Sequence, residues 1–126
     1  MNKKEFLEKK NLTENQFNGL EKIEGGLFLS MFESIPEGFN PTVNGDLYID
    51  NVTSIPKGFN PTVTGNLFLR NVTSIPKGFN PIVGGSLLLN RLISAPKGFN
   101  PTVGGSLDLS SLTSIPEGFN PIINCN

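Results

Sequence analysis

The chain has 126 residues, with ten Lys and Arg residues, eleven Asp and Glu residues and a formal net charge of −1. This length suits a single domain, and a net charge near zero argues against a general nucleic-acid-binding protein. There is no histidine, and the only cysteine is Cys125. An intramolecular disulfide framework and histidine-dependent acid–base catalysis are therefore excluded.

The first residues predict a short helix from residue 2 to residue 9. We expect Phe6 and Leu7 to form its buried side. This segment has basic residues but no apolar core region, so it does not resemble a secretion signal. No stretch of the chain approaches the length of a membrane span. Together with the single cysteine, these features favour a cytoplasmic location without membrane contact.

A second helix is predicted from residue 14 to residue 19. Thr13 and Gln16 have the spacing of a capping box, in which each side chain bonds a backbone N–H of the other residue. Phe17 and Leu20 are expected to point inward. We expect residues 1–24 to form a helical cap that belongs to one structural domain with residues 25–126, because a solenoid must cover its exposed apolar end.

A pattern of twenty residues occurs five times between residues 25 and 124. Each copy opens on a glycine followed by two apolar residues two positions apart, such as Gly45, Leu47 and Ile49, and this spacing is typical of one face of a strand. A unit of this length cannot bury its apolar residues alone, but stacked copies can. The sequence therefore predicts a mainly β fold, a parallel β-solenoid of five coils.

The remainder of each copy supplies further columns of like residues. The apolar columns are represented in the second copy by Val52, Ile55, Phe59 and Val63. The prolines are expected outside the paired strands, because proline has no N–H to donate. The glycine two positions after the first proline of each copy, such as Gly58 after Pro56, should adopt a positive φ. An asparagine column is expected to bond exposed backbone groups of neighbouring coils: Asn40, Asn60, Asn80, Asn100 and Asn120.

The segment Leu107–Phe119, Leu-Asp-Leu-Ser-Ser-Leu-Thr-Ser-Ile-Pro-Glu-Gly-Phe, resembles a leucine-rich repeat. The resemblance covers residues 25–124 and is closest to short repeats of bacterial and phage proteins. It implies protein binding through the strand face, in a phage or bacterial accessory protein such as an inhibitor of a host factor. The repeat is about two residues shorter than the common pattern, and we interpret the usual asparagine after the strand as missing. A horseshoe and a nearly straight solenoid both fit.

No set of residues indicates an enzyme. Asp46 and Asp50 lie four positions apart on one predicted strand, which is too far along an extended chain for a tight catalytic pair. The turn Gly84-Gly85-Ser86 lacks the lysine and the helix of a phosphate-binding loop. Without histidine there is no thiolate–imidazole metal site. We therefore expect no catalytic residues, no metal and no cofactor.

One outward position lies between the two inward residues of each predicted strand. An exposed aromatic stripe with polar neighbours is typical of a protein-binding surface. The alternatives are that residues 1–24 cover the stripe, or that aromatic residues here only suit strands. The candidate binding residues are Phe28, Tyr48, Asp50, Phe68, Arg70, Leu88 and Asn90.

The turns carry a row of basic residues formed by Lys57, Lys77 and Lys97. Like charges about 5 Å apart in water repel by only about 0.8 kcal/mol, so such a row is tolerated as a solvated surface. The alternative is that it contacts an anionic partner.

Nothing after Phe119 resembles a capping helix. We therefore expect Leu107, Leu109 and Ile123 to present an open edge that invites pairing with another chain, unless the final residues cover it. These features predict a non-enzymatic module that binds another protein through its strand face. The alternative is a structural protein that forms a homodimer through its C-terminal coil.

Overall fold

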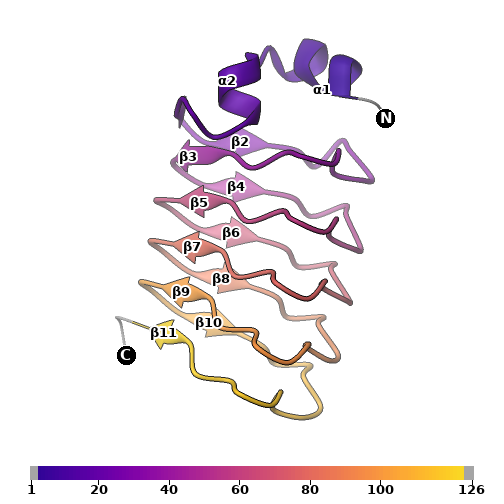
Figure 1. Ribbon diagram of the computed structural model, residues 1–126, viewed down its shortest axis with the longest axis vertical. Coiled ribbons are helices and arrows are strands. Elements are labelled where there is room, and N and C mark those ends of the chain that lie inside the picture. The colour runs from indigo at the N-terminus through magenta and orange to yellow at the C-terminus, as the bar shows by residue number, and fades with distance from the viewer. Residues whose placement is uncertain (1–2, 124–126) are drawn as a thin grey trace.

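The computed structural model describes residues 3–123. In this part of the chain, two short helices precede a series of very short strands that form two parallel sheets. The chain passes from one sheet to the other and back in each repeat, and Figure 1 shows the resulting coils stacked one below another. The protein is therefore a mainly β parallel solenoid of about five coils, with a repeat of about twenty residues, as the sequence predicts.

The elements have the following bounds. The helices are α1 (Lys3–Lys10) and α2 (Glu14–Phe17). The first sheet, sheet A, contains β1 (Ile23–Glu24), β3 (Thr42–Asn44), β5 (Thr62–Val63), β7 (Ile82–Val83), β9 (Thr102–Val103) and β11 (Ile122–Ile123). The second sheet, sheet B, contains β2 (Leu27–Phe28), β4 (Leu47–Tyr48), β6 (Leu67–Phe68), β8 (Leu87–Leu88) and β10 (Leu107–Asp108).

Each strand pairs with its equivalent one repeat later. Leu47 is opposite Leu67 in sheet B, and Val43 is opposite Val63 in sheet A. Because this register equals the sequence repeat, apolar residues stack on apolar residues at the inward positions of both sheets. Sheet B was predicted from two apolar residues two positions apart in each copy, such as Leu47 and Ile49. Sheet A was not predicted, because each of its copies has only one such inward residue, such as Val63, and therefore no alternation.

The apolar columns form one continuous core. Leu47, Phe59 and Val63 are each at most 2% exposed. The phenylalanine rings stack along the solenoid, as between Phe59 and Phe79, whose ring centroids are 6.3 Å apart with 8° between their planes. The isoleucine column is less complete, because its later members lie nearer the surface: Ile75 and Ala95 are half-buried, and Ile115 is exposed.

The glycines that open the second to fifth copies are required by the close approach of neighbouring coils. A Cβ atom added at Gly85 would lie 2.8 Å from the carbonyl oxygen of Gly65. The turn glycines have a different role. Gly58, for example, has a φ of 87°, which places it in the left-handed region as predicted.

The predicted asparagine column is confirmed. The backbone N–H of Asn60 donates to Oδ1 of Asn40 at 2.6 Å, and Asn80 donates to Asn60 in the same way at 2.7 Å. The column continues through Asn100 and Asn120. Each side chain therefore supplies an acceptor to a backbone group that no strand would satisfy.

The interpretation that the asparagine after the strand is missing is wrong for the second and third copies. The side-chain amides of Asn51 and Asn71 donate to the backbone carbonyls of Ser30 and Asp50, one coil earlier. These asparagines stand directly before Val52 and Val72, so a second set of side chains ties the second and third coils to the coils before them.

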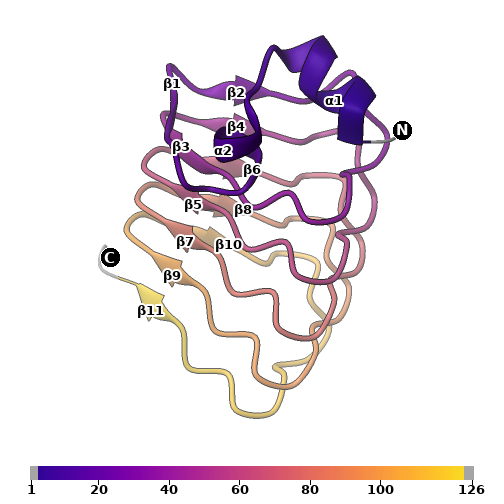
Figure 2. The same cartoon turned by 45° about the horizontal axis from the view of Figure 1, so that its top comes forward.

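The helices cover the apolar end of the first coil, as Figure 2 shows. Phe6 of α1 is fully buried, and its ring centroid lies 4.8 Å from that of Phe39. Phe17 of α2 is 5.3 Å from Phe39. These rings extend the apolar columns beyond the first coil and close its end.

The predicted start of the second helix is confirmed, but its end is not. Thr13 and Gln16 form the capping box, with N–H to side-chain distances of 3.1 and 3.0 Å. The helix ends at Phe17, and Gly19 then adopts a φ of +80°. Because the chain turns there, Leu20 points outward and is 78% exposed. The prediction that Leu20 is buried is wrong.

Candidate protein-binding face

The outward positions of sheet B lie in one row. The parallel register places Phe28 opposite Tyr48, Tyr48 opposite Phe68, and Phe68 opposite Leu88. Asp108 ends the row opposite Leu88. We call these five residues the strand-face row. The side chains stand side by side because every strand of sheet B contributes one outward residue.

The aromatic members of the row form a continuous stack. The ring of Tyr48 is 4.7 Å from that of Phe28, with 9° between their planes. It is 4.4 Å from that of Phe68, with 5° between the planes. Phe28 is 57% exposed, while Tyr48 and Phe68 are half-buried. Because the rings cover one another's faces, their edges are what the row presents to solvent.

The N-terminal helices do not cover this row. They pack through Phe6 and Phe17 on the end of the core, around Phe32 and Phe39. An open hollow of about 510 Å³ lies between the helical segment and Phe28, lined also by Leu12 and by residues 21–24. The alternative in which residues 1–24 bury the stripe is therefore wrong for the described residues.

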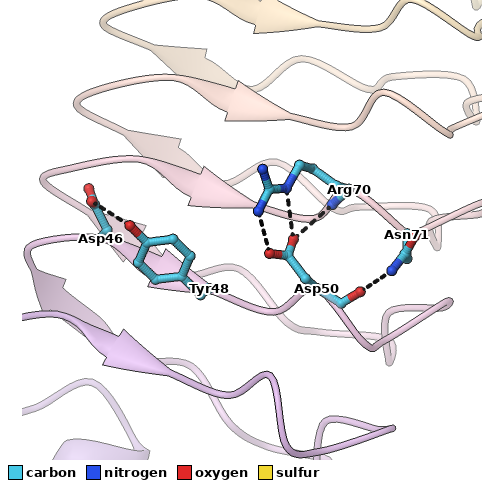
Figure 3. Close-up of polar contacts among 5 residues, drawn as sticks. All are labelled: Asp46, Tyr48, Asp50, Arg70 and Asn71. Carbon is cyan, nitrogen blue, oxygen red and sulfur yellow. Dashed lines mark hydrogen bonds and ion pairs between the residues drawn. The ribbon is translucent and has the colours of Figure 1, made fainter.

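Asp46 lies at one side of the aromatic stack. The hydroxyl of Tyr48 donates to Oδ2 of Asp46 at 3.3 Å, as Figure 3 shows. Desolvation of the half-buried ring raises the pKa of Tyr48 above its ordinary value, and the negative charge and hydrogen bond of Asp46 raise this pKa further. Oδ1 of the same carboxylate accepts the backbone N–H of Asn66 at 2.7 Å, which fixes its orientation.

An ion pair lies at the other side of the stack. Nη2 of Arg70 is 2.7 Å from Oδ2 of Asp50, and Nε donates to Oδ1 at 3.3 Å (Figure 3). The hydrogen bond and charge of Asp50 raise the pKa of Arg70. Cζ of Arg70 also lies 5.0 Å from the centroid of the Phe68 ring, so the guanidinium packs against the stack as well as against the carboxylate.

The far end of the candidate face differs from the aromatic part. Leu88 is half-buried and continues the apolar row, whereas Asp108 accepts the N–H of Ser110 at 3.0 Å. Oδ1 of Asn90 is buried and has no hydrogen-bond partner in the described part of the chain. The aromatic, ion-paired part of the face therefore lies over the first three coils.

The lysine row lies outside this face. Lys57, Lys77 and Lys97 are all exposed. Nζ of Lys97 is 3.7 Å from Oε1 of Glu117, and both side chains are more than 70% exposed. An ion pair of this kind contributes little to stability. The geometry of this row is that of a solvated surface.

The predicted C-terminal edge is open over the described residues. Leu107 and Leu109 are half-buried, although their equivalents Leu87 and Leu89 are fully buried. Ile123 is 44% exposed, whereas the equivalent Val103 is 0% exposed. The last residues of the chain, which include Cys125, lie outside the described part.

Two features of the candidate face were not predicted. The pairing of Asp50 with Arg70 and the packing of Arg70 on Phe68 both join residues of different coils. The sequence signal was present, since opposite charges stand twenty residues apart in one column. Residues 3–123 contain no group of three His, Cys, Asp or Glu side chains that would hold a metal ion.

The fold defines the class of this protein as a repeat protein with a parallel β-solenoid. The chain matches no family model, no curated protein and no solved structure. None of the helices in the described part is long and apolar enough to cross a bilayer.

Proposed function

We propose that this protein is a non-enzymatic binding module of the leucine-rich-repeat type, which binds another protein through the outward face of sheet B. The observation that carries this proposal is the half-exposed stack of Phe28, Tyr48 and Phe68, bordered by the Asp50–Arg70 ion pair. The resemblance to short bacterial and phage repeats suggests a cytoplasmic accessory role, including inhibition of a host factor.

The stack is suited to binding because its side chains are already ordered. Aromatic residues and arginine are the residues that most often dominate binding energy at protein interfaces. Ordering a flexible side chain on binding costs about 0.5–1.5 kcal/mol. The rings of Tyr48 and Phe68 are held by each other, and Arg70 is held by Asp50. A partner would therefore meet a surface that loses little conformational freedom.

The chemistry of the face favours a protein over a polyanion. The positive charge of Arg70 is matched by Asp50, and Asp46 adds a further negative charge beside Tyr48. The chain as a whole has a net charge of −1. Since phosphate contacts need unpaired basic residues, the suitable partner is a protein surface that packs apolar groups against the ring edges and donates hydrogen bonds to Asp46.

The opposing interpretation is that the stack only stabilises the solenoid. Stacked aromatic pairs contribute about 0.5–1.5 kcal/mol each beyond their burial. A stack with this role alone would leave partner binding unchanged when the rings are removed. The two interpretations therefore predict different effects of the same substitution.

The test is a comparison of two double variants in parallel affinity capture, followed by direct measurement of Kd with the captured protein. Tyr48→Ser with Phe68→Ser removes the centre of the stack. Thr62→Ser with Ile82→Ser is the matched control, because these residues occupy outward positions of sheet A. We expect the first variant to bind at least about thirtyfold more weakly, corresponding to about 2 kcal/mol. Equal affinities for folded forms of both variants would contradict the proposal.

A further inference from the structure

The C-terminal coil has an unpaired backbone edge in sheet B. The N–H groups of Leu87 and Leu89 donate to the carbonyls of Ser106 and Asp108 in the next coil, at 2.9 and 3.0 Å. The equivalent N–H groups of Leu107 and Leu109 point out of the end of the solenoid and donate to no residue of the described chain. The carbonyl of Leu107 points to the same side as its N–H, as in any extended strand.

The carbonyl of Leu109 is different, because it is already bonded. It accepts the N–H of Leu112 at 3.0 Å, within the same coil. The outward edge of sheet B therefore offers two donors, from Leu107 and Leu109, and one acceptor, from Leu107.

Sheet A exposes the opposite set of groups. The first residue of each strand of sheet A from β5 to β11 donates its N–H to the preceding coil, as Ile122 does to the carbonyl of Pro101 at 3.2 Å. By the same geometry, the carbonyl of Pro121 and both backbone groups of Ile123 point out of the end. Proline has no N–H. The outward edge of sheet A therefore offers two acceptors, from Pro121 and Ile123, and one donor, from Ile123.

We propose that two copies of this chain pair end to end, with β10 of each copy antiparallel to β11 of the other. The arrows of the two sheets point in opposite directions in Figure 1. A twofold axis that is parallel to the strands and perpendicular to the solenoid axis therefore brings β10 of one copy against β11 of the other in antiparallel orientation. The two edges offer equal numbers of complementary groups, and the same operation forms both strand pairs. Such an interface is isologous and closed.

The hydrogen-bonding groups define a single register. Leu107 lies opposite Ile123 of the second copy, and the two residues exchange both of their hydrogen bonds. Two positions further along, the N–H of Leu109 donates to the carbonyl of Pro121 of the second copy. The missing N–H of proline is then opposite the one carbonyl that is already bonded, that of Leu109. This register leaves none of these outward groups without a partner.

The side chains of the end coil agree with a second copy as the occupant. The twofold axis keeps the half-buried residues Leu107, Leu109 and Phe119 over the apolar interior of the other copy. Residues 101–123 contain only two charged residues, Asp108 and Glu117, and Glu117 pairs with Lys97. The opposite end of the solenoid is closed by Phe6 and Phe17, so it is not available for a head-to-tail contact.

The first test measures molar mass against concentration for the whole chain, by light scattering or sedimentation equilibrium. We expect a reversible dimer. Ile123→Lys places a charge in the interface and should weaken dimerisation at least tenfold. Ile82→Lys is the control, because Ile82 is 53% exposed on the outward face of sheet A, away from the end. A strict monomer up to about 1 mM, or unchanged dimerisation of Ile123→Lys, would overturn the proposal.

The second test examines the register and does not depend on weakening the fold. In this register, Asp108 of one copy and Ile122 of the other form a non-hydrogen-bonded pair. Their Cα atoms are about 4.5 Å apart, which is within the range of a disulfide. In a single chain they belong to different sheets, β10 and β11. Asp108→Cys with Ile122→Cys, in a Cys125→Ser background, should therefore form a covalent dimer that reducing agent dissociates.

The control for this crosslink is Ser110→Cys with Ile122→Cys in the same background, which moves one cysteine out of register. It should crosslink at least tenfold more slowly. Equal rates for the two pairs, or no covalent dimer from the first pair, would overturn the register. Neither experiment changes the aromatic stack of Phe28, Tyr48 and Phe68 or the Asp50–Arg70 ion pair, so their outcome is independent of the proposed protein-binding function.

Discussion

The rings of Tyr48 and Phe68 lie 4.4 Å apart with 5° between their planes, although their residues are twenty positions apart in the chain. Parallel pairing of β4 with β6 places them opposite each other. Tyr48 also stacks on Phe28 from the other side, so it makes two ring contacts whereas Phe28 makes one. This difference in position predicts a difference in stability.

Tyr48→Ser should lower the free energy of unfolding by about 1–3 kcal/mol, because two aromatic contacts of about 0.5–1.5 kcal/mol each are lost. Phe28→Ser, at the exposed end of the stack, should lower it by about 0.5–1.5 kcal/mol. Urea denaturation followed by circular dichroism measures both values. An equal or larger loss for Phe28→Ser would mean that the rings do not stack in solution.

The pH dependence of Tyr48 offers a second prediction. Tyr48 is the only tyrosine of the chain, so the ultraviolet absorbance of tyrosinate reports this residue alone. We expect a pKa above 10.0 in the folded protein and a return to about that value in concentrated urea. Since the folded pKa is the higher one, Tyr48 stabilises the fold fully below about pH 10, and this contribution is lost as the pH rises through the folded pKa.

The same titration tests the cause of the shift. Asp46→Asn removes a negative charge beside the hydroxyl and should lower the pKa of Tyr48 relative to the unchanged chain. The value should stay above that of the unfolded chain, because desolvation of the ring remains. A native pKa at or below the unfolded value would contradict the half-buried position of the ring.

The phenylalanine column predicts a large effect at its centre. Phe79 is 2% exposed and stacks on both Phe59 and Phe99. Phe79→Ala should therefore lower the free energy of unfolding by about 3–5 kcal/mol. Lys77→Ala, two positions earlier at an exposed site, should remain within about 0.5 kcal/mol of the unchanged chain. Similar melting of the two variants would show that the columns are assigned incorrectly.

The asparagine column predicts an effect that depends on position along the solenoid. Oδ1 of Asn80 accepts the backbone N–H of Asn100 at 2.6 Å. Asn80→Ala leaves that N–H without its partner and should lower the free energy of unfolding by about 1–2 kcal/mol. Asn120→Ala should change it by less than about 0.5 kcal/mol, because no coil in the described residues follows it.

Urea denaturation again distinguishes these two variants. A large loss for Asn120→Ala with a small loss for Asn80→Ala would contradict the role of the column. If the chain dimerises through its C-terminal coil, both measurements need the same protein concentration, because dimerisation adds to the apparent stability.

The repeat itself could be predicted from the sequence because it constrains every coil in the same way. The columns of Phe59 and Asn60, the positive φ of Gly58 and the parallel register all follow from one period, since the pairing of like residues satisfies every copy at once. The strand-face row could be predicted for the same reason, because it occupies the one outward position of each predicted strand.

What the sequence left open depends on contacts that have no period. The exposure of Leu20 was decided by the end of α2 at Phe17 and by the turn at Gly19. The two-residue strands of sheet A were not predicted, since hydrogen bonds to the next coil define them and no pattern along the chain does. The sequence by itself thus determined how the coils stack. Only the tertiary structure decided which side chains of neighbouring coils meet, as Arg70 meets both Asp50 and Phe68, because such pairs depend on distances between coils and not on positions along the chain.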